Sequence, residues 1–497
     1  MRFGIDLNEI KRDKFLLLTS SLLVDRVFLY TNLVETLQKS GDVTIWAASA
    51  ANNQYSFEWN KMNAAVENFP AIRPFREFPY NYLRRLNEFV WDYRFQLPSR
   101  TSARQHVFDK KQHFKIRVLK YPARLLALLR AEKLLENNLE KLLLSYPRSA
   151  EAEKRLRELN PSVLVTTGAF QFEQPAIFAA AKKLGIPTLA YIPSWDNVTT
   201  KNRMVFKYDG YIVWSERIKK ELREIYSYTR DQPIYVVGAP QYDVFRQKRF
   251  FQTRAEFCRE QNLQSDRPII VYALGSPNFL QEHHGALDLA ARIARGELGD
   301  VQMLVRPHPI HDNSELAEVF DQFAPRVRLQ QTPNAGKVLT ERSQDERQIV
   351  EWVNTFRHAA VVVNLSSTVT VDAAICDVPI VNLDFDPQPG AADQELVQDI
   401  NHKWNHFQPV AESGGVWLVK NFEETAHAVK SYLKNPALHQ TKRRWIAQYV
   451  CGYLSGDCGE RMADVIVNFA RGRANVQDNL SEREMRAVSL QTQSLKQ

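Results

Sequence analysis

Short apolar runs alternate with segments of helical periodicity along most of the chain. The run at 14–19 (KFLLLT) is almost wholly apolar, and the apolar positions within 26–40 recur every three or four residues. The first pattern predicts a buried strand, and the second predicts an amphipathic helix. Gly41 ends that helix, and 43–48 is apolar again, which predicts a second strand. The chain therefore opens with a predicted strand–helix–strand unit.

The same alternation returns after 151 and continues to about 440. Further strands are predicted at 162–167, 188–192, 210–214, 234–237, 268–274, 301–305, 361–364, 379–383 and 415–419. Helical spacing lies between them, for example at 174–184, 216–226 and 421–433. Short β-branched runs separated by helices are typical of parallel sheets that are buried on both faces. No GxGxxG or GxxxxGK[ST] loop occurs, which argues against the common dinucleotide-binding and P-loop folds.

The best domain boundary lies at 238–243 (GAPQYD), where Gly and Pro interrupt the pattern. We expect a first α/β domain at 1–240, with a helical, basic insertion at about 52–150, and a second at 241–440. Helices at 441–470 are expected to pack back on the first domain. The polar segment 471–497 has little periodicity, which predicts a disordered tail.

Composition narrows the class of protein without selecting a function. A chain of 497 residues is too long for one core, and it contains no apolar run long enough to cross a membrane. The four cysteines form no CxxC pair, which favours reduced thiols and a cytoplasmic location. A formal charge of +8 suits anionic partners such as nucleotides, acidic lipid headgroups or nucleic acid, and selects none of them.

The insertion is rich in aromatic and basic residues. Between 100 and 133 there are ten Lys or Arg, against only Asp109 and Glu132. One interpretation is a basic, partly amphipathic surface that lies on an anionic membrane or over an anionic acceptor. The alternative is a solvated helical face whose aromatic residues form a local core. The alternative is favoured because the basic residues show no clean one-face spacing.

Polar side chains follow several predicted strands of the second domain. Arg306 and His308 come directly after one strand, and Ser366, Ser367 and Thr368 follow another and could cap a helix over 369–376. In an open α/β sheet, ligands bind beyond the carboxyl ends of the strands. We therefore expect these groups to converge on an anion site suited to a diphosphate.

Two further strand ends of this domain carry small or acidic residues. Gly275 and Ser276 form a turn that could approach a phosphate closely, and Asp384 and Asp386 follow the strand at 379–383. The sequence DFD also matches a short D-x-D metal motif. A match of three residues is a weak signal, and we expect no metal.

The most distinctive loop of the first domain is PSWDNVTTKN at 193–202. Trp195 offers a stacking face, and Asp196, Asn197 and Thr199 offer hydrogen bonds suited to a sugar or polyol acceptor. An Asp/Asn turn with a buried tryptophan explains the same residues equally well.

Several motifs together resemble one superfamily. They are GAPQYD at the boundary, RPHP at 306–309, STVTVDAA at 367–374, PIVNLDFD at 379–386 and GDCGER at 456–461. Their order is similar to the GT-B superfamily, in its branch around CDP-glycerol glycerophosphotransferases, capsule and surface polysaccharide enzymes and UDP-N-acetylglucosamine 2-epimerase relatives. The likeness covers about 160–465. It implies an α/β fold of two Rossmann-like parallel-sheet domains that face an inter-domain cleft.

The resemblance also implies roles for individual residues. His308 and Arg306 would contact the donor phosphates, Ser367 and Thr368 would bind the diphosphate, and Asp372 would bind the ribose hydroxyls. Asp384 or Asp386 would hold the transferred group. Alternatively, RPHP only ends a strand, with its His bonded to a carbonyl, and Asp372 is a solvated helix carboxylate.

The expected function is transfer from a nucleotide-sugar or CDP-glycerol-like donor to a glycan or lipid-linked acceptor, with no further cofactor and no nucleic acid. The expected catalytic residues are His308, on the leaving nucleotide, and Asp196, as general base; Asp25 and Glu173 are the next candidates for the base. Peripheral association with the inner membrane face is a further expectation. The alternatives are an epimerase, although no TERPE-like run follows the Ser-capped helix, and a non-catalytic sugar-nucleotide-binding protein.

Overall fold

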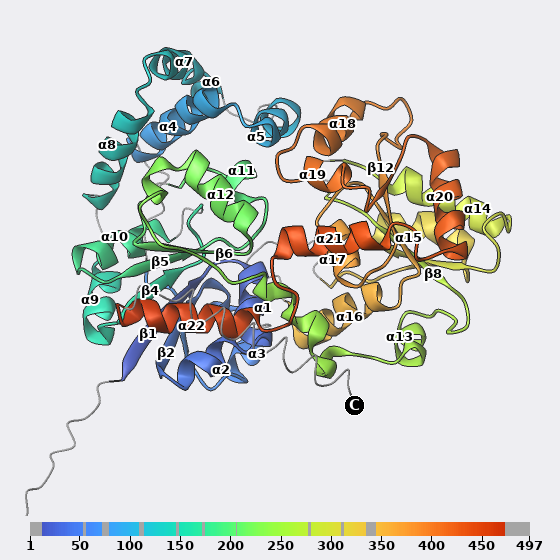
Figure 1. Cartoon of the computed structure of the whole chain (residues 1–497), viewed down its shortest axis with the longest axis horizontal. Coiled ribbons are helices and arrows are strands. Elements are labelled where there is room, and N and C mark those ends of the chain that lie inside the picture. The colour runs from blue at the N-terminus through green and yellow to red at the C-terminus, as the bar shows by residue number, and fades with distance from the viewer. Residues whose placement is uncertain are drawn as a thin grey trace, which may run out of the picture.

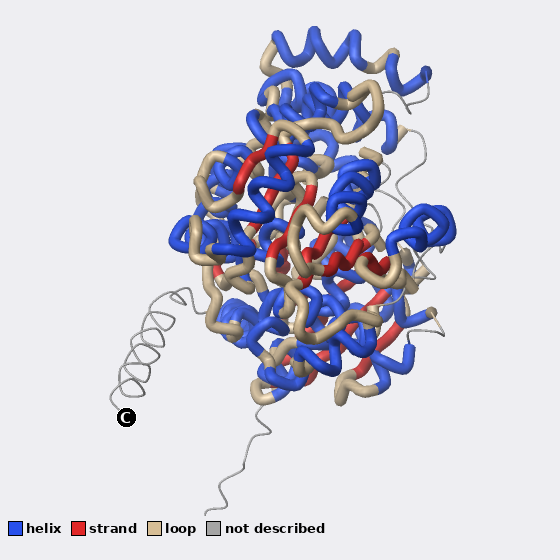
Figure 2. The backbone as a smooth tube through the Cα atoms, turned by 90° about the vertical axis from the view of Figure 1, so that its right-hand side faces the viewer, coloured by secondary structure: helices blue, strands red, loops and turns tan. Residues whose placement is uncertain are grey.

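The computed structural model describes residues 12–52, 56–71, 79–108, 114–145, 149–170, 174–204, 206–276, 280–309, 313–333 and 344–472. These residues form two lobes, each built on one parallel sheet with helices on both faces (Figure 1). Figure 2 shows, from the side, the red strands enclosed by blue helices.

The first sheet has the strand order β3-β2-β1-β4-β5-β6-β7, and all its pairs are parallel. Its strands are β1 (Asp13–Thr19), β2 (Gly41–Ala47), β3 (Ala65–Glu67), β4 (Val163–Thr166), β5 (Thr188–Tyr191), β6 (Gly210–Val213) and β7 (Ile234–Val236). The central strands are buried along their whole length, because helices cover both faces of the sheet. The order reverses between β1 and β4, and this reversal opens a crevice at their carboxyl ends.

The second sheet repeats this plan in the order β10-β9-β8-β11-β12-β13, again with parallel pairs only. Its strands are β8 (Ile269–Ala273), β9 (Gln302–Arg306), β10 (Val327–Leu329), β11 (Val361–Asn364), β12 (Ile380–Leu383) and β13 (Trp417–Val419). Its switch point lies between β8 and β11. The prediction of two Rossmann-like parallel-sheet domains is thus confirmed.

Helices surround both sheets. Those that precede β8 are α1 (Leu22–Tyr30), α2 (Leu33–Gln38), α3 (Ser56–Asn60), α4 (Tyr80–Phe95), α5 (Pro98–Ala103), α6 (Phe114–Arg117), α7 (Lys120–Leu128), α8 (Glu132–Leu144), α9 (Ala150–Leu159), α10 (Pro175–Lys183), α11 (Asn197–Thr200), α12 (Glu216–Ile225) and α13 (Arg254–Glu260). Those that follow are α14 (His283–Ala294), α15 (Asn313–Phe320), α16 (Glu346–Arg357), α17 (Val369–Ile375), α18 (Gln394–His402), α19 (Gln408–Ala411), α20 (Phe422–Lys434), α21 (Gln440–Cys451) and α22 (Cys458–Ala470). No helix in the described ranges is long and apolar enough to cross a membrane.

The single helix predicted over 26–40 is instead two helices, α1 and α2. The first of them, α1, begins four residues earlier than expected. The Thr31 hydroxyl donates to the carbonyl of Val27 at 2.6 Å and accepts the N–H of Leu33 at 3.2 Å, so it satisfies backbone groups on both sides of the break. Gly459 packs on Thr31, where an added Cβ would lie 2.7 Å from Oγ1. The break therefore makes room for the start of α22.

The last two helices lie on different domains. α22 packs against α2 and β4, and its end is tied to the first strand by the ion pair between Arg471 and Asp13 at 2.7 Å. α21 packs instead against α17 of the second domain, where Arg444 pairs with Asp377 at 2.9 Å. Of the helices expected at 441–470 on the first domain, α22 lies there, whereas α21 packs mainly on the second domain and meets the first where the Arg217 guanidinium lies 5.7 Å from the centre of the Tyr449 ring. The expected tail lies outside the described residues from 473 onward.

The insertion forms a helical layer on the first domain, built from α4 to α8. Tryptophan and arginine side chains hold it to that domain: Arg203 pairs with Glu136 at 2.6 Å, and Trp91 stacks on Tyr226 with ring centroids 5.9 Å apart. At its other side, the insertion reaches the second domain through hydrogen bonds between Ser99 and Asn405. It thus spans from one domain to the other.

Candidate functional site

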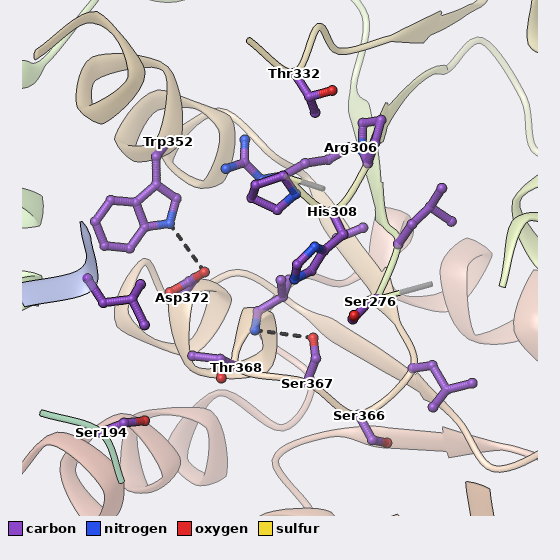
Figure 3. Close-up of a pocket in the computed structure, with 18 of the residues that line it drawn as sticks. Ser194, Ser276, Arg306, His308, Thr332, Trp352, Ser366, Ser367, Thr368 and Asp372 are labelled. Atoms are coloured by element: carbon purple, nitrogen blue, oxygen red, sulfur yellow. Dashed lines mark hydrogen bonds between the residues drawn. The ribbon is translucent and has the colours of Figure 1, made fainter. Parts of the chain in front are cut away.

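A cavity of about 700 Å³ lies where the carboxyl ends of both sheets meet. Its walls are the segments that follow β1, β5, β8, β9 and β11, together with α16 and the stretch 404–407 after α18. Figure 3 shows the side contributed mainly by the second domain, with the His308 imidazole at its centre and Arg306, Ser276, Ser367 and Asp372 around it. The two switch points of the fold therefore open into one pocket.

Arg306 is the main cation on this side of the pocket. Its Nη1 donates to Gln330 Oε1 at 2.5 Å, and its guanidinium lies 5.8 Å from the centre of the Phe356 ring. Burial lowers the pKa of Arg306, while the carboxylates of Glu351 and Asp372 raise it. A guanidinium held in this way is oriented before any ligand arrives, which is what strong binding of an anion requires.

The turn between β11 and α17 brings hydroxyl groups to the same pocket. Buried Asn364 organises it: Asn364 Oδ1 accepts the N–H of Ser367 at 3.1 Å and the hydroxyl of Thr370 at 3.2 Å. Ser366 has a left-handed backbone (φ 38°), which turns the chain sharply into the helix. The expected side-chain cap is only partly present, because Ser367 Oγ accepts the N–H of Val369 at 3.3 Å while Thr368, at the N-cap, makes no capping bond.

Asp372 faces the pocket from one turn inside α17. Its Oδ2 accepts the indole N–H of Trp352 at 3.2 Å (Figure 3). Burial raises its pKa to about 6, although Trp352, Arg26 and Arg306 each lower it. The bond from Trp352 therefore holds the buried carboxyl group in a fixed position.

Gly275 and Ser276 line the pocket directly after β8, as expected for residues at the carboxyl end of a strand. They lie beside Glu282, which the sequence analysis did not predict as a site residue. The Glu282 carboxyl lies against the turn: Oε1 accepts the N–H of Gly275 at 3.0 Å, and a Cβ on Gly275 would lie only 2.2 Å from it. Burial raises the pKa of Glu282 to about 8, against hydrogen bonds from Gly275 and Leu365 that lower it. Oε2 is buried without a hydrogen-bond partner.

Arg26 of α1 is a second cation of the pocket, and the sequence analysis did not predict it. Its Nη2 donates to Gln241 Oε1 at 2.6 Å, and its guanidinium lies 4.4 Å from the centre of the Trp352 ring. It lies within α1, several residues beyond the end of β1, so a search for polar residues directly after the strands does not find it. Arg26 thus brings the first domain to the side of Asp372.

The first domain also contributes Trp195 and Asp196. The Trp195 ring is almost wholly buried against His406, with centroids 5.0 Å apart, so most of its face is not available for stacking. Asp196 accepts hydrogen bonds from Ser194 and, at 2.8 Å, from Thr200. The pKa of Asp196 is lowered overall. Burial raises it, but Lys201, His406 and the hydroxyl donors together lower it by more than burial raises it. The carboxylate is therefore ionised near neutral pH.

Other predicted site residues do not line the pocket. Asn197 and Thr199 are buried within the 193–202 turn, where they bond to Asp196. Asp384 accepts from Asn401 at 3.0 Å and contacts His402 at 2.9 Å. Asp386 accepts the backbone N–H groups of 388 and 393, which folds its own loop. The geometry therefore uses these four side chains to shape local structure.

The alternative general bases lie elsewhere. Asp25 accepts hydrogen bonds from Thr19 and Ser49 at 2.6 Å each, and burial raises its pKa to about 6 against both. It is a buried residue of α1 and does not line the pocket. Glu173 lies outside the described residues. Within the described part of the chain, no group of three or more His, Cys, Asp or Glu side chains is arranged to hold a metal ion.

Comparisons with known proteins match the chain by structure alone. No family model matches, and a search of curated proteins finds no match. Among solved structures, S. aureus MnaA in a co-structure with UDP covers 92% of this chain and 97% of its own, with a TM-score of 0.52 and 10% identity. UDP-GlcNAc 2-epimerase from Neisseria meningitidis bound to UDP-GlcNAc covers 92% and 100%, with the same TM-score and identity. Both likenesses extend over two parallel-sheet domains, and the chain therefore has the GT-B fold.

Proposed function

We propose that the chain is an enzyme that binds a nucleotide-activated donor in the inter-domain pocket and transfers the activated sugar or polyol to an acceptor hydroxyl. The observation that carries the proposal is the convergence of Arg306, His308, the 366–368 turn and Gly275–Ser276 on one wall of that pocket. A guanidinium, an imidazole and hydroxyl groups at the ends of parallel strands suit the diphosphate of such a donor. Asp372 on the same wall suits the ribose hydroxyls.

The wall opposite supplies the chemistry for the acceptor. An acceptor hydroxyl attacks the donor carbon or phosphorus, its proton passes to the ionised Asp196, and the bond to the leaving nucleotide oxygen breaks. Negative charge then grows on the leaving phosphate, where Arg306 and His308 stabilise it without first having to reorient. Lobe closure brings the two walls together around the reactants.

An epimerase-type reaction is the second candidate. It is supported by the fold-level likeness to the two structures above, one a co-structure with UDP and the other bound to UDP-GlcNAc. In an epimerase-type reaction, the second-domain wall of the pocket holds the nucleotide, and the sugar is converted in the pocket without transfer to an acceptor. A non-catalytic sugar-nucleotide-binding protein is the third candidate, and only turnover distinguishes it from the other two.

The acceptor side of the proposal includes a glycan or a lipid-linked acceptor. A lipid-linked acceptor requires that the protein work at a membrane surface, which is consistent with the net positive charge. The location proposed is the cytoplasm, with the protein at the inner face of the membrane.

The first experiment is a thermal-shift screen across UDP, CDP, GDP and their sugar and glycerol conjugates. A ligand at about 100 times its dissociation constant adds about 2.7 kcal/mol of stability, which is readily measured. Arg306→Gln should weaken binding of the best nucleotide at least tenfold, because a charged hydrogen bond is worth about 1.5–3 kcal/mol. Arg295→Gln, an exposed arginine of the same domain, is the matched control. The proposal fails if no nucleotide shifts the transition, or if both variants bind equally.

Turnover then separates the candidates. Donor cleavage that needs an acceptor supports transfer, conversion without one supports epimerisation, and saturable binding without either supports a binding protein. For transfer, Asp196→Asn should lower kcat about 10²- to 10⁴-fold with donor affinity unchanged. Exposed Asp231→Asn is the control. Near-normal turnover of the Asp196→Asn variant would remove Asp196 as the base.

A further inference from the structure

An unbroken apolar stripe is exposed on α6 and α7. Its members are Phe114, Val118, Tyr121, Leu125 and Leu128, which follow one another every three or four residues and are 41–81% exposed. The two helices are nearly continuous, because the N–H of Val118 bonds to the carbonyl of Phe114 and the N–H of Ala123 to that of Leu119. The stripe therefore lies along one helical face. Single exposed leucines are common on protein surfaces, but a contiguous apolar face of this length marks an interaction surface.

This stripe is distinct from the face that holds the helices to the protein. Leu119, Ala123 and Ala127 are buried against Phe89 and Val90 of α4, and they form the small apolar core of the insertion. α7 thus has one apolar face that packs on the fold and a second that no described residue covers. Because apolar residues of the buried face and of the exposed stripe alternate along α7, the sequence shows no single amphipathic face.

Basic side chains surround the stripe. Arg117, Arg124, Arg130 and Lys133 are all exposed, and the Arg124 guanidinium lies 5.4 Å from the centre of the Tyr93 ring, which steadies it beside the stripe. Among the described residues between 114 and 134, the one acidic side chain is Glu132, and it is already paired with Arg94 at 3.2 Å. The rim is therefore strongly positive.

The stripe also lies at the edge of the molecule. α7 is the uppermost element in Figure 1, away from both sheets, and the insertion occupies the same edge in Figure 2 after the quarter turn about the vertical axis. The helices that carry the stripe are therefore at the periphery of the fold.

We propose that α6 and α7 bind the surface of an anionic lipid bilayer. The stripe enters the boundary between headgroups and acyl chains, and the basic rim contacts the anionic headgroups, which is how an amphipathic helix lies in a membrane interface. A second copy of the chain is a poorer occupant, since a symmetric contact through this face would bring the two arginine-rich rims together and like charges would repel. The binding does not depend on the nucleotide pocket.

Flotation of the full chain with lipid vesicles tests the proposal. Two vesicle types are used: pure phosphatidylcholine, and an equal mixture of phosphatidylcholine and phosphatidylglycerol. We expect binding to the mixed vesicles only, weakened by added salt. The double variant Leu125→Ser/Leu128→Ser should weaken binding about tenfold for each leucine. The double variant Arg124→Gln/Arg130→Gln should weaken it about fivefold for each arginine.

Matched controls separate this surface from general effects. Phe57→Ser removes an apolar side chain that is 48% exposed on α3, and Lys154→Gln/Lys220→Gln removes two charges from other helices. These variants should bind vesicles as the wild type does, and all variants should keep the wild-type melting temperature and nucleotide shift. The proposal is overturned if the wild type does not float with anionic vesicles, or if the stripe variant floats equally well. It is also overturned if the stripe variant changes only a concentration-dependent dimer, since the surface would then join two copies.

Discussion

Glu282 is a buried carboxyl group that lies against the Gly275–Ser276 turn, beside the place proposed for the diphosphate. Its pKa is raised by burial from an ordinary value of 4.5 to about 8, so it is neutral over most of the physiological range. A neutral carboxyl can accept the N–H of Gly275 and still leave the wall positive. Above pH 8 the same group carries a negative charge beside the place proposed for the diphosphate.

The affinity for the donor should therefore depend on pH through this group. We expect the nucleotide dissociation constant to rise as the pH passes through about 8, because ionised Glu282 repels the phosphates. Glu282→Gln keeps the acceptor oxygen and removes the titration, so its dissociation constant should stay level across that range. Glu351→Gln, another pocket carboxylate, should retain the wild-type profile. Calorimetric titration at several pH values measures this, and a level wild-type profile would contradict it.

Residues of the pocket were predictable where they directly follow a strand of known type. Arg306, His308 and Ser367 lie on the pocket wall for that reason, whereas Arg26 lies inside α1, well beyond the end of β1. Glu282 could not be found in this way. It lies at the N-cap of α14, well after the strand end, and only the folded loop returns its carboxyl to Gly275.

At the scale of elements, the β11–α17 turn depends on one buried amide. Asn364 accepts from Ser367 and Thr370, and its Nδ2 donates to Asn382 Oδ1 at 3.1 Å. Asn364→Leu would remove the acceptor of the Ser367 N–H and one hydrogen-bond partner each of Thr370 and Asn382, and should lower the free energy of unfolding by about 3 kcal/mol. It should also weaken nucleotide binding, because the turn is no longer held.

A neighbouring substitution provides the comparison for this turn. Asn382→Leu leaves Ser367 bonded to Asn364, so it should lower stability while nucleotide affinity changes much less. Denaturant unfolding and nucleotide titration of both variants measure the two effects. Equal losses of affinity in the two variants would mean that Asn364 acts through stability alone.

The elements themselves were largely predictable, because apolar β-branched runs and helical spacing differ clearly. The prediction of one helix over 26–40 was wrong at Thr31: the apolar periodicity continues through this residue, yet the helix is interrupted there. The cause is the packing of Gly459, more than 400 residues later, and no local pattern carries that information. The insertion was obscure for a related reason, since α7 has apolar residues on two faces.

For the whole molecule, the contact between Ser99 and Asn405 links the insertion to the rim of the pocket. The Ser99 hydroxyl donates to Asn405 Oδ1 at 3.1 Å and accepts the Asn405 N–H at 2.7 Å. Ser99→Ala removes both bonds, so the ligand-free lobes should separate more readily. We expect a larger radius of gyration by small-angle X-ray scattering, which returns towards the wild-type value with bound nucleotide.

A second serine in the same helix is the control for this link. Ser102 is also buried in α5, and its hydroxyl has no hydrogen-bond partner, so Ser102→Ala should leave the scattering profile unchanged. If Ser99→Ala also leaves the profile unchanged, the other contacts between the lobes, such as those of Trp195 with His406 and of Arg26 with Trp352, are enough to hold them together.

The place of α22 has a consequence for how this protein is made. The helix packs on α2 and β4, so the first domain to leave the ribosome lacks one of its own covering helices until residue 470 has been synthesised. Domains usually complete their folding in the order of synthesis. Here the amino-terminal half must wait, with an apolar face uncovered, for a segment that emerges after the whole second domain. Nascent chains stalled before 458 should accordingly recruit chaperones at that face, and those stalled well beyond 472 should release them.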